Sequence, residues 1–167
     1  MFTLVSTRFN NETFQENIEY RKRKEIVCIY CSPQPMSQKI PLESLVVVVE
    51  MNNSINQIEG IGLIKNQIET KNYNVYDTRN FNRYIFKGDY RISRDELVRN
   101  HEKIVEIFDY ILFKEKTHMK RGSGFTTIPE KLLKHSRCEN ISIKNWIKEI
   151  FLEKYIIHDK LTQQIPK

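Results

Sequence analysis

The sequence lacks alanine altogether and has only five glycines, five prolines, three cysteines and one tryptophan among 167 residues. With so few glycines and prolines, no stretch resembles a flexible linker or a low-complexity segment. No apolar run approaches the roughly 20 residues of a membrane-spanning helix, and Met1–Val5 lacks the basic region of a secretory signal. Three cysteines make no disulfide framework, so we expect reduced thiols, an intracellular location in cytoplasm or nucleus, and no membrane association.

The chain is rich in charged and apolar residues. Lys and Arg total 27 against 21 Asp and Glu, which gives a net charge of +6 and favours a polyanionic partner. Apolar residues make up 40%, enough for a folded core. We expect residues 1–160 to form a single domain and residues 161–167 to form a frayed tail.

Hydrophobic periodicity places strands in the first half of the chain and helices in the second. Strands are expected over residues 2–9, 25–31, 45–51, 57–65, 73–76, 80–86 and 90–92. Helices are expected over 10–24, 94–112, 130–135 and 141–157, the second of them behind the capping box Ser93-x-x-Glu96. This order predicts an α+β fold, because strands and helices do not alternate as in a parallel βαβ fold.

Two strands carry more specific signals. Leu45–Met51 is apolar on both faces, which predicts a central strand covered on both sides. Gly60-Ile61-Gly62 lies inside the next strand, and two glycines there predict a bulge or a close approach of another segment.

The pair formed by Val46–Val49 and Gly60–Ile64 resembles the central hairpin of PUA-like domains, the superfamily that includes the PUA, ASCH, EVE and YTH modules. The resemblance implies a small β-barrel, here with packed C-terminal helices, that binds RNA or reads a modified base. Readers of modified bases use tryptophan cages, and the only tryptophan, Trp146, lies in a predicted helix. No cage residue is therefore assigned.

A second resemblance is to proteins of large nucleocytoplasmic DNA viruses. It is based on the stretches Asn80–Tyr84, Lys87-Gly88 and Lys120–Gly124. It implies a viral protein that acts in the host cytoplasm or nucleus, or in the virion.

The strongest local candidate for phosphate contact is the basic, glycine-containing segment after the second helix. Glycines let backbone N–H groups converge on an anion, and adjacent cations neutralise phosphate charge. The candidate residues are Lys116, His118, Lys120, Arg121, Gly122, Ser123 and Gly124. Walker-type spacing is absent, and a solvated basic loop remains the alternative.

A second candidate is the aromatic segment around Phe81. Alternation in a strand would place Arg79, Phe81 and Arg83 on one face and Tyr84 on the other, so that arginines hold phosphates while a ring stacks on a base. An ordinary half-buried strand is the alternative, because aromatic residues are common in strands.

Metal and catalytic sites have weaker signals. Cys28, Cys31, His135 and Cys138 have tolerable zinc spacing, but positions three apart in a strand face opposite ways. A metal-dependent nuclease would need clustered carboxylates, for which Glu50, Glu59 and Asp77 are available without a diagnostic spacing. We expect no cofactor and no enzymatic activity.

The sequence thus predicts a nucleic-acid-binding module, with RNA favoured over DNA, that uses a basic groove and the aromatic segment. The alternative function is a viral structural or virion-associated interaction module, with the helices from Arg94 onward as the partner surface. The sequence does not fix the oligomeric state.

Overall fold

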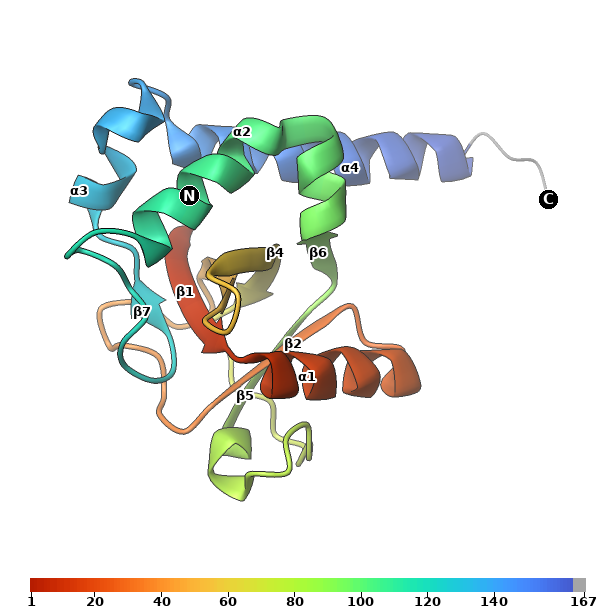
Figure 1. Ribbon diagram of the computed structural model, residues 1–167. Helices are drawn as coiled ribbons and strands as arrows, with labels where there is room; N and C mark the ends of the chain where they lie inside the picture. The colour runs from red at the N-terminus through yellow and green to blue at the C-terminus, as the bar shows by residue number, and fades with distance from the viewer. Residues whose placement is uncertain (164–167) are drawn as a thin grey trace. The chain divides into compact units, whose positions relative to one another are not determined.

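The computed structural model describes residues 1–163 of the chain, with side-chain surroundings for residues 1–156 (Figure 1). The chain forms two compact units, Met1–Pro129 and Glu130–Lys167. The expected boundary at residue 160 falls within the last helix, α4 (Ile143–Gln163), and residues 164–167 of the expected tail lie outside the described residues. Both segments predicted to contact phosphate belong to the first unit.

A mixed five-stranded sheet forms the centre of the first unit (Figure 1). Its strands, in order, are β6 (Tyr90–Ser93), β4 (Gln57–Lys65), β3 (Leu45–Asn52), β1 (Thr3–Phe9) and β7 (Thr126–Thr127). β1 runs parallel to β3, and all other neighbours are antiparallel. β3 lies in the middle and is buried from Val46 onward, which confirms the prediction of a central strand.

The parallel pairing of β1 and β3 determines where the site can form. It requires a crossover, since the chain must return to the same end of the sheet. α1 (Asn11–Lys24) and β2 (Cys28–Ser32) supply that crossover, and the Asn10 side chain caps α1 by accepting a hydrogen bond from the Thr13 N–H (2.8 Å). The last residues of β1 and β3 therefore lie side by side at one edge of the sheet.

The two glycines of β4 lie where neighbouring segments come close to the strand, as the sequence predicts. The β3–β4 ladder shifts register between Glu50 and Met51, which marks the bulge. A Cβ atom at Gly62 would overlap the hydroxyl of Tyr30, and one at Gly60 would lie 2.6 Å from the Ile92 carbonyl oxygen. Glycine at these positions lets neighbouring segments pack directly on the strand.

A second, two-stranded ladder pairs β2 with β5 (Tyr84–Gly88). The predicted α+β class is confirmed, but among the described residues the ladders do not close into a barrel. The edge strands are short, with two residues in β7 and four in β6, so neither continues the sheet to β2 or β5.

The strand prediction is wrong for residues 73–76 and 80–83. Arg79–Asn82 form the 3-10 helix η1, and β5 begins only at Tyr84. Arg79, Phe81 and Arg83 therefore do not share the face of a strand, because a 3-10 helix repeats every three residues rather than every two.

The side chain of Asn82 explains this difference. Its Oδ1 accepts hydrogen bonds from the N–H groups of Val75 (3.1 Å) and Tyr76 (3.0 Å), and its Nδ2 donates to the Tyr76 carbonyl oxygen (2.6 Å). These backbone groups are thus bonded to a side chain and cannot join a ladder.

Helix α2 (Arg94–Phe113) begins at the predicted capping box, in which Ser93 Oγ accepts from the Glu96 N–H (3.3 Å) and the Glu96 side chain accepts from the Ser93 N–H (2.9 Å). The helix kinks at His101, whose φ of −146° and ψ of 45° are not helical. Its predicted apolar stripe, which includes Ile104 and Phe108, is buried.

The second unit is helical as far as it is described. It contains α3 (Glu130–Leu133), the 3-10 helix η2 (Ser136–Cys138) and α4. The predicted helices over 130–135 and 141–157 are confirmed, with shifted ends. No helix among the described residues is long and apolar enough to cross a membrane.

Candidate nucleic-acid interface

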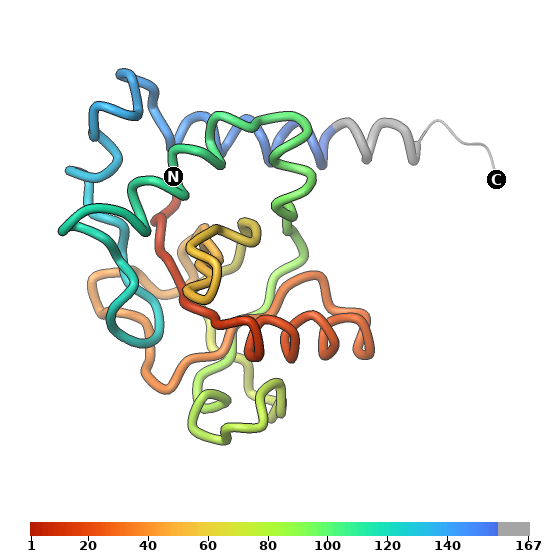
Figure 2. Tube along the Cα trace, in the orientation of Figure 1, coloured from red at the N-terminus to blue at the C-terminus, as the bar shows by residue number. Residues whose placement is uncertain are grey.

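A cavity of about 270 Å³ opens at the sheet edge where β1 and β3 end. Both segments singled out from the sequence contribute to its lining: Phe81 comes from η1, and Gly122, Ser123 and Gly124 come from the loop that joins α2 to β7. Figure 2 traces this loop, in teal, back beside the end of β1. The fold thus brings together two segments that lie far apart in the chain.

The remaining predicted contact residues do not line the cavity. They are Arg79, Arg83, Tyr84, Lys116, His118, Lys120 and Arg121. Arg79 and Arg83 are exposed on either side of Phe81 in the chain, and Arg121 is exposed next to Gly122. Tyr84 instead packs against the hydrophobic core, with the Arg83 guanidinium 5.6 Å from its ring centroid.

Four aromatic residues line the cavity: Phe9 at the end of β1, Tyr30 from β2, Tyr76, and Phe81. Tyr76 and Phe81 meet edge to face, with their centroids 6.3 Å apart and their planes at 83°. Sequence reasoning missed both tyrosines. It did predict that some segment approaches Gly60-Ile61-Gly62 closely, and the Tyr30 hydroxyl is the group that does so at Gly62.

The hydroxyl groups of both tyrosines are fixed inside the protein. Tyr30 donates to Glu50 Oε1 (2.7 Å), and Tyr76 accepts a hydrogen bond from Asn17 Nδ2 (3.0 Å). Asn17 also donates to the Ile29 carbonyl oxygen (2.8 Å), and its Oδ1 accepts from Arg21 Nε (2.8 Å). The two rings are therefore positioned before any ligand arrives.

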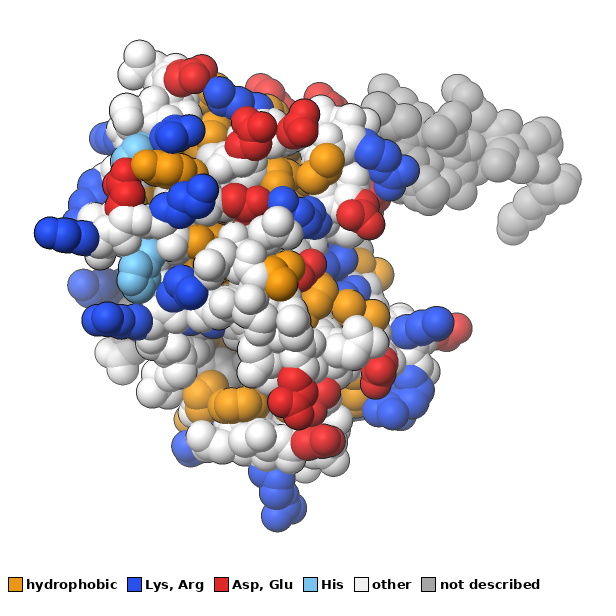
Figure 3. All heavy atoms as spheres, in the orientation of Figure 1, with side chains coloured by type: hydrophobic (Ala, Val, Ile, Leu, Met, Phe, Trp, Pro, Cys, Tyr) orange, Lys and Arg blue, Asp and Glu red, His pale blue; other side chains and the backbone are white. Residues whose placement is uncertain are grey.

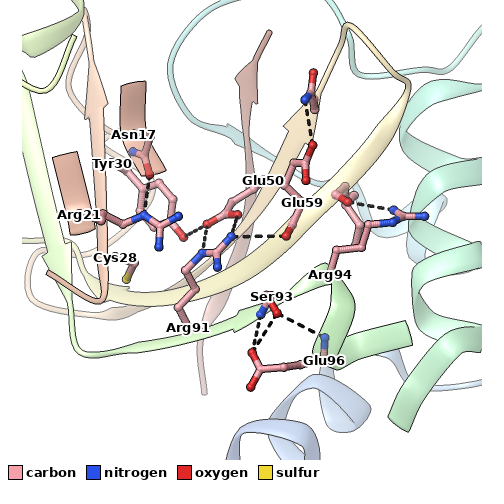
Figure 4. A network of polar contacts seen from close by, with 12 residues as sticks. Asn17, Arg21, Cys28, Tyr30, Glu50, Glu59, Arg91, Ser93, Arg94 and Glu96 are labelled. Atoms are coloured by element: carbon pink, nitrogen blue, oxygen red, sulfur yellow. Dashed lines mark hydrogen bonds and ion pairs between the residues drawn. The ribbon is translucent and has the colours of Figure 1, made fainter. Parts of the chain in front are cut away.

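Glu50 is the centre of a buried polar network (Figure 4). Arg91 Nε and Nη2 donate to its two carboxylate oxygens at 2.8 and 2.6 Å, in a bidentate pair. Burial alone would raise the pKa of Glu50, but the Arg91 charge and the hydrogen bonds from Arg91 and Tyr30 outweigh it and hold that pKa below its ordinary value. Glu50 is thus an ionised partner of the Tyr30 hydroxyl.

Arg8, near the end of β1, holds in place the part of the α2–β7 loop that contains Gly122 and Gly124, called the glycine loop below. Its guanidinium donates to the carbonyl oxygens of Met119 (2.8 Å) and Gly124 (3.2 Å) and to Thr126 Oγ1 (2.7 Å). Gly124 has a φ of +69°, and a Cβ atom there would lie 2.6 Å from Ser32 Oγ, so both conformation and space require glycine. Burial lowers the pKa of Arg8, although an arginine side chain stays charged in proteins.

Asn53, which lines the cavity, has one side-chain hydrogen-bonding group without a partner. Its Nδ2 donates to the Lys120 carbonyl oxygen (2.9 Å), which ties the glycine loop to the turn after β3. Its Oδ1 is buried and has no hydrogen-bond partner. An unsatisfied buried acceptor is costly, so a ligand N–H that reached it would be bound selectively.

The cavity lining carries little charge. Among the described residues that line the cavity, Arg8 is the only charged one, and none is a carboxylate or a histidine. Burial raises the pKa of the Cys31 thiol to about 12, so this side chain stays protonated at neutral pH and is a poor nucleophile.

Among the described residues, those considered for a metal form no ligand cluster. Within the part of the chain that it describes, no group of three His, Cys, Asp or Glu side chains could hold an ion. On β2, Cys28 is buried and contacts the carbonyl oxygens of Gly88 and Tyr90, whereas Cys31 lines the cavity. His135 Nδ1 accepts from the Arg137 N–H within the second unit.

The carboxylates considered for a nuclease are also engaged elsewhere. Glu50 pairs with Arg91, Glu59 Oε1 accepts from Asn52 Nδ2 (2.8 Å), and Asp77 lies in the segment before η1.

Charge on the face drawn in Figure 3 is mixed. Lys and Arg side chains are most frequent along its left edge, and Asp and Glu side chains lie among them and further towards the centre. This face therefore carries cations and carboxylates side by side.

Comparisons of the chain with protein-family models, with curated proteins and with solved structures give no match.

Proposed function

We propose that the protein binds nucleic acid by admitting one base into the cavity at the ends of β1 and β3, while cations outside the cavity contact the phosphates. The same proposal includes a preference for RNA over DNA and a relationship to the PUA-like domains, whose fold is a small β-barrel. The central hairpin β3–β4 inside an α+β fold supports that relationship.

The observation that carries this proposal is the meeting of Phe81 and Gly122–Gly124 at one cavity with tyrosine walls. Flat aromatic faces stack on any base, and each such stack contributes about 1–3 kcal/mol. Because the rings of Tyr30 and Tyr76 are already fixed by buried hydrogen bonds, little ordering cost opposes binding.

The polar groups at the cavity fit the edge of a base. In this proposal the unpartnered Oδ1 of Asn53 accepts a hydrogen bond from a ring or exocyclic N–H, a group that a backbone phosphodiester lacks. The exposed Arg121 directly precedes the lining residue Gly122, and the exposed Arg79 and Arg83 lie two positions on either side of Phe81. In this proposal they contact the backbone of the strand that carries the base.

The test is fluorescence anisotropy with a short, labelled, single-stranded RNA of mixed sequence and with its DNA counterpart. We expect Phe81→Ala to weaken RNA binding roughly tenfold or more, because one base–aromatic stack is lost. Tyr90→Ala is the matched control: this ring is 44% exposed, against 37% for Phe81, but lies on β6 and does not line the cavity.

The proposal requires the two variants to differ. Equal binding by Phe81→Ala and the wild-type protein would show that the cavity takes no base. Failure of the wild-type protein to bind either oligonucleotide would overturn the proposed function itself.

A further inference from the structure

Ser123 lies at the exposed tip of the loop between α2 and β7. It is flanked by Gly122 and Gly124, whose φ values of +95° and +69° keep this part of the chain out of helix and strand. Its hydroxyl makes no hydrogen bond to any described residue. A free hydroxyl on an irregular, exposed loop tip is the kind of group that a modifying enzyme can reach.

The residues before Ser123 give this hydroxyl a specific chemical context. Lys120 and Arg121 precede it by three and two positions. Serine/threonine kinases with acidic substrate grooves select cations at such positions by charge complementarity. The contacts of Arg8 to Met119, Gly124 and Thr126 hold the loop on both sides, so its tip stays presented to solvent.

We propose that Ser123 is a phosphorylation site for a kinase that selects basic substrates, and that phosphorylation turns off nucleic-acid binding. This inference rests on the proposed function, because Ser123 lines the cavity that takes the base. In the reaction the Ser123 Oγ–phosphorus bond forms, and the bond from the γ-phosphorus of ATP to the ADP oxygen breaks. The hydroxyl proton passes to the aspartate base of the kinase.

The phosphoryl group would act through its charge. It adds about −1.5 to −2 at neutral pH, at the mouth of a cavity whose flanking cations are proposed to contact phosphates. The modified serine pairs with Lys120 or Arg121 and repels the incoming backbone, so both effects weaken binding.

Ser93 provides a control within the same chain. It also has an arginine two positions before it, but Arg91 is paired with buried Glu50, and Ser93 Oγ accepts from the Glu96 N–H at the start of α2. The same kinase should therefore modify Ser123 and leave Ser93 unmodified, although both serines have an arginine two positions before them. Ser93 also differs at the third position before it, where Tyr90 stands in place of a cation.

The experiment treats the full-length protein with the catalytic subunit of cAMP-dependent protein kinase and Mg-ATP. Intact mass and peptide mapping locate the phosphate, and anisotropy with labelled single-stranded RNA measures binding before and after. We expect modification at Ser123, none in Ser123→Ala, and affinity for RNA lower on the order of tenfold at low salt. Ser123→Asp should weaken RNA binding more than the neutral, similarly sized Ser123→Asn, because only the first adds negative charge at the cavity.

The outcomes separate the two proposals. If wild-type protein binds RNA but Ser123 is not modified, or if the modified protein binds equally well, the phosphorylation switch is overturned and the proposed function stands. If the unmodified protein binds no RNA, the proposed function fails and the switch fails with it.

Discussion

Tyr30 has different roles at its two ends. Its ring lines the cavity, while its hydroxyl donates to Glu50 in the interior, across the space that Gly62 leaves open. Tyr30 therefore cannot move away from a side chain added at position 62 without breaking its buried hydrogen bond to Glu50. The glycine is therefore as important to the cavity as the aromatic ring itself.

Gly62→Ala should destabilise the protein by about 1–3 kcal/mol, the usual cost of overpacking a core. The new methyl group would overlap the Tyr30 hydroxyl and push the ring towards the cavity. Urea unfolding measures the change in stability. Removal of the hydroxyl in Gly62→Ala/Tyr30→Phe should recover part of the loss, and strictly additive effects in this double-mutant cycle would contradict the argument.

Glu50→Gln should cost about 3–5 kcal/mol near neutral pH, because Arg91 is then buried without its charged partner. The folded-state pKa of Glu50 lies below the ordinary value of 4.5, so its stabilising effect is complete above that pH and is lost as the pH falls through the folded-state value. Urea unfolding at a series of pH values should show wild type and variant converging only in acid.

An exposed ion pair provides the control for this measurement. Lys144 and Glu130 lie 2.7 Å apart in the second unit, with side chains 39% and 62% exposed. Glu130→Gln should therefore change stability by no more than about 1 kcal/mol. If Glu50→Gln costs as little as Glu130→Gln, the buried network does not stabilise the fold.

At the scale of elements, one side chain determines the conformation of the segment that carries Phe81. Asn82 bonds to both backbone groups of Tyr76 and to the N–H of Val75, which closes a loop before β5. The loop sets Tyr76 and Phe81 against each other at the cavity. η1 itself is only one short turn and has no side-chain cap.

Asn82→Ala should therefore loosen this loop, at a cost of about 1–3 kcal/mol for the backbone groups left without partners. Hydrogen exchange should accelerate at the amides of Val75 and Tyr76 and remain unchanged in the β3–β4 ladder. RNA binding should weaken along with it. Asn80→Ala, two positions away on the exposed side of η1, should change neither property.

The sequence predicts these elements unequally well. Strand β4 was predicted at its observed bounds, Gln57–Lys65, and the box of Ser93 and Glu96 marked the start of α2, because periodicity and capping are local signals. Asn82 carries no such signal, since its partners depend on how the chain folds back. β7, with two residues, was missed because it forms only by pairing with β1.

The site shows the same limit. Phe81 and the glycines at 122 and 124 could be singled out by residue type, whereas Tyr30 and Tyr76 read as ordinary core residues. Their role depends on the parallel β1–β3 pair, at whose ends residues from five separate segments line the cavity. Arg8 was also missed, because a lone arginine in a strand gives no indication of the loop that it will bind.

At the scale of the whole molecule, a net charge of +6 favours polyanions without specifying where they bind. Because charge is mixed on the face drawn in Figure 3, the proposed binding is tested at particular cations rather than through the net charge. The basic run Arg21–Lys24 ends α1, whereas residues at the start of α1 line the cavity. The run at the end of α1 and the pair Lys120 and Arg121 before Gly122 can therefore be changed separately by mutation.

We predict that the logarithm of the RNA affinity falls linearly with the logarithm of the salt concentration, by about 0.7 per phosphate contacted. Lys120→Gln/Arg121→Gln should make this slope shallower, by the amount expected for the loss of about one to two phosphate contacts. The charge-matched control Lys22→Gln/Lys24→Gln, at the far end of α1, should keep the wild-type slope. Identical slopes for the two double variants would place the phosphate contacts elsewhere.

The most direct test of base insertion is photo-cross-linking of the full-length protein to single-stranded RNA that contains 4-thiouridine, with the linked peptides mapped by mass spectrometry. We predict cross-links at Tyr30, Tyr76 or Phe81, or within residues 122–124, and their loss in Phe81→Ala but not in Tyr90→Ala. Cross-links confined to residues 21–24 or to residues 130–163 would contradict the claim that a base enters this cavity.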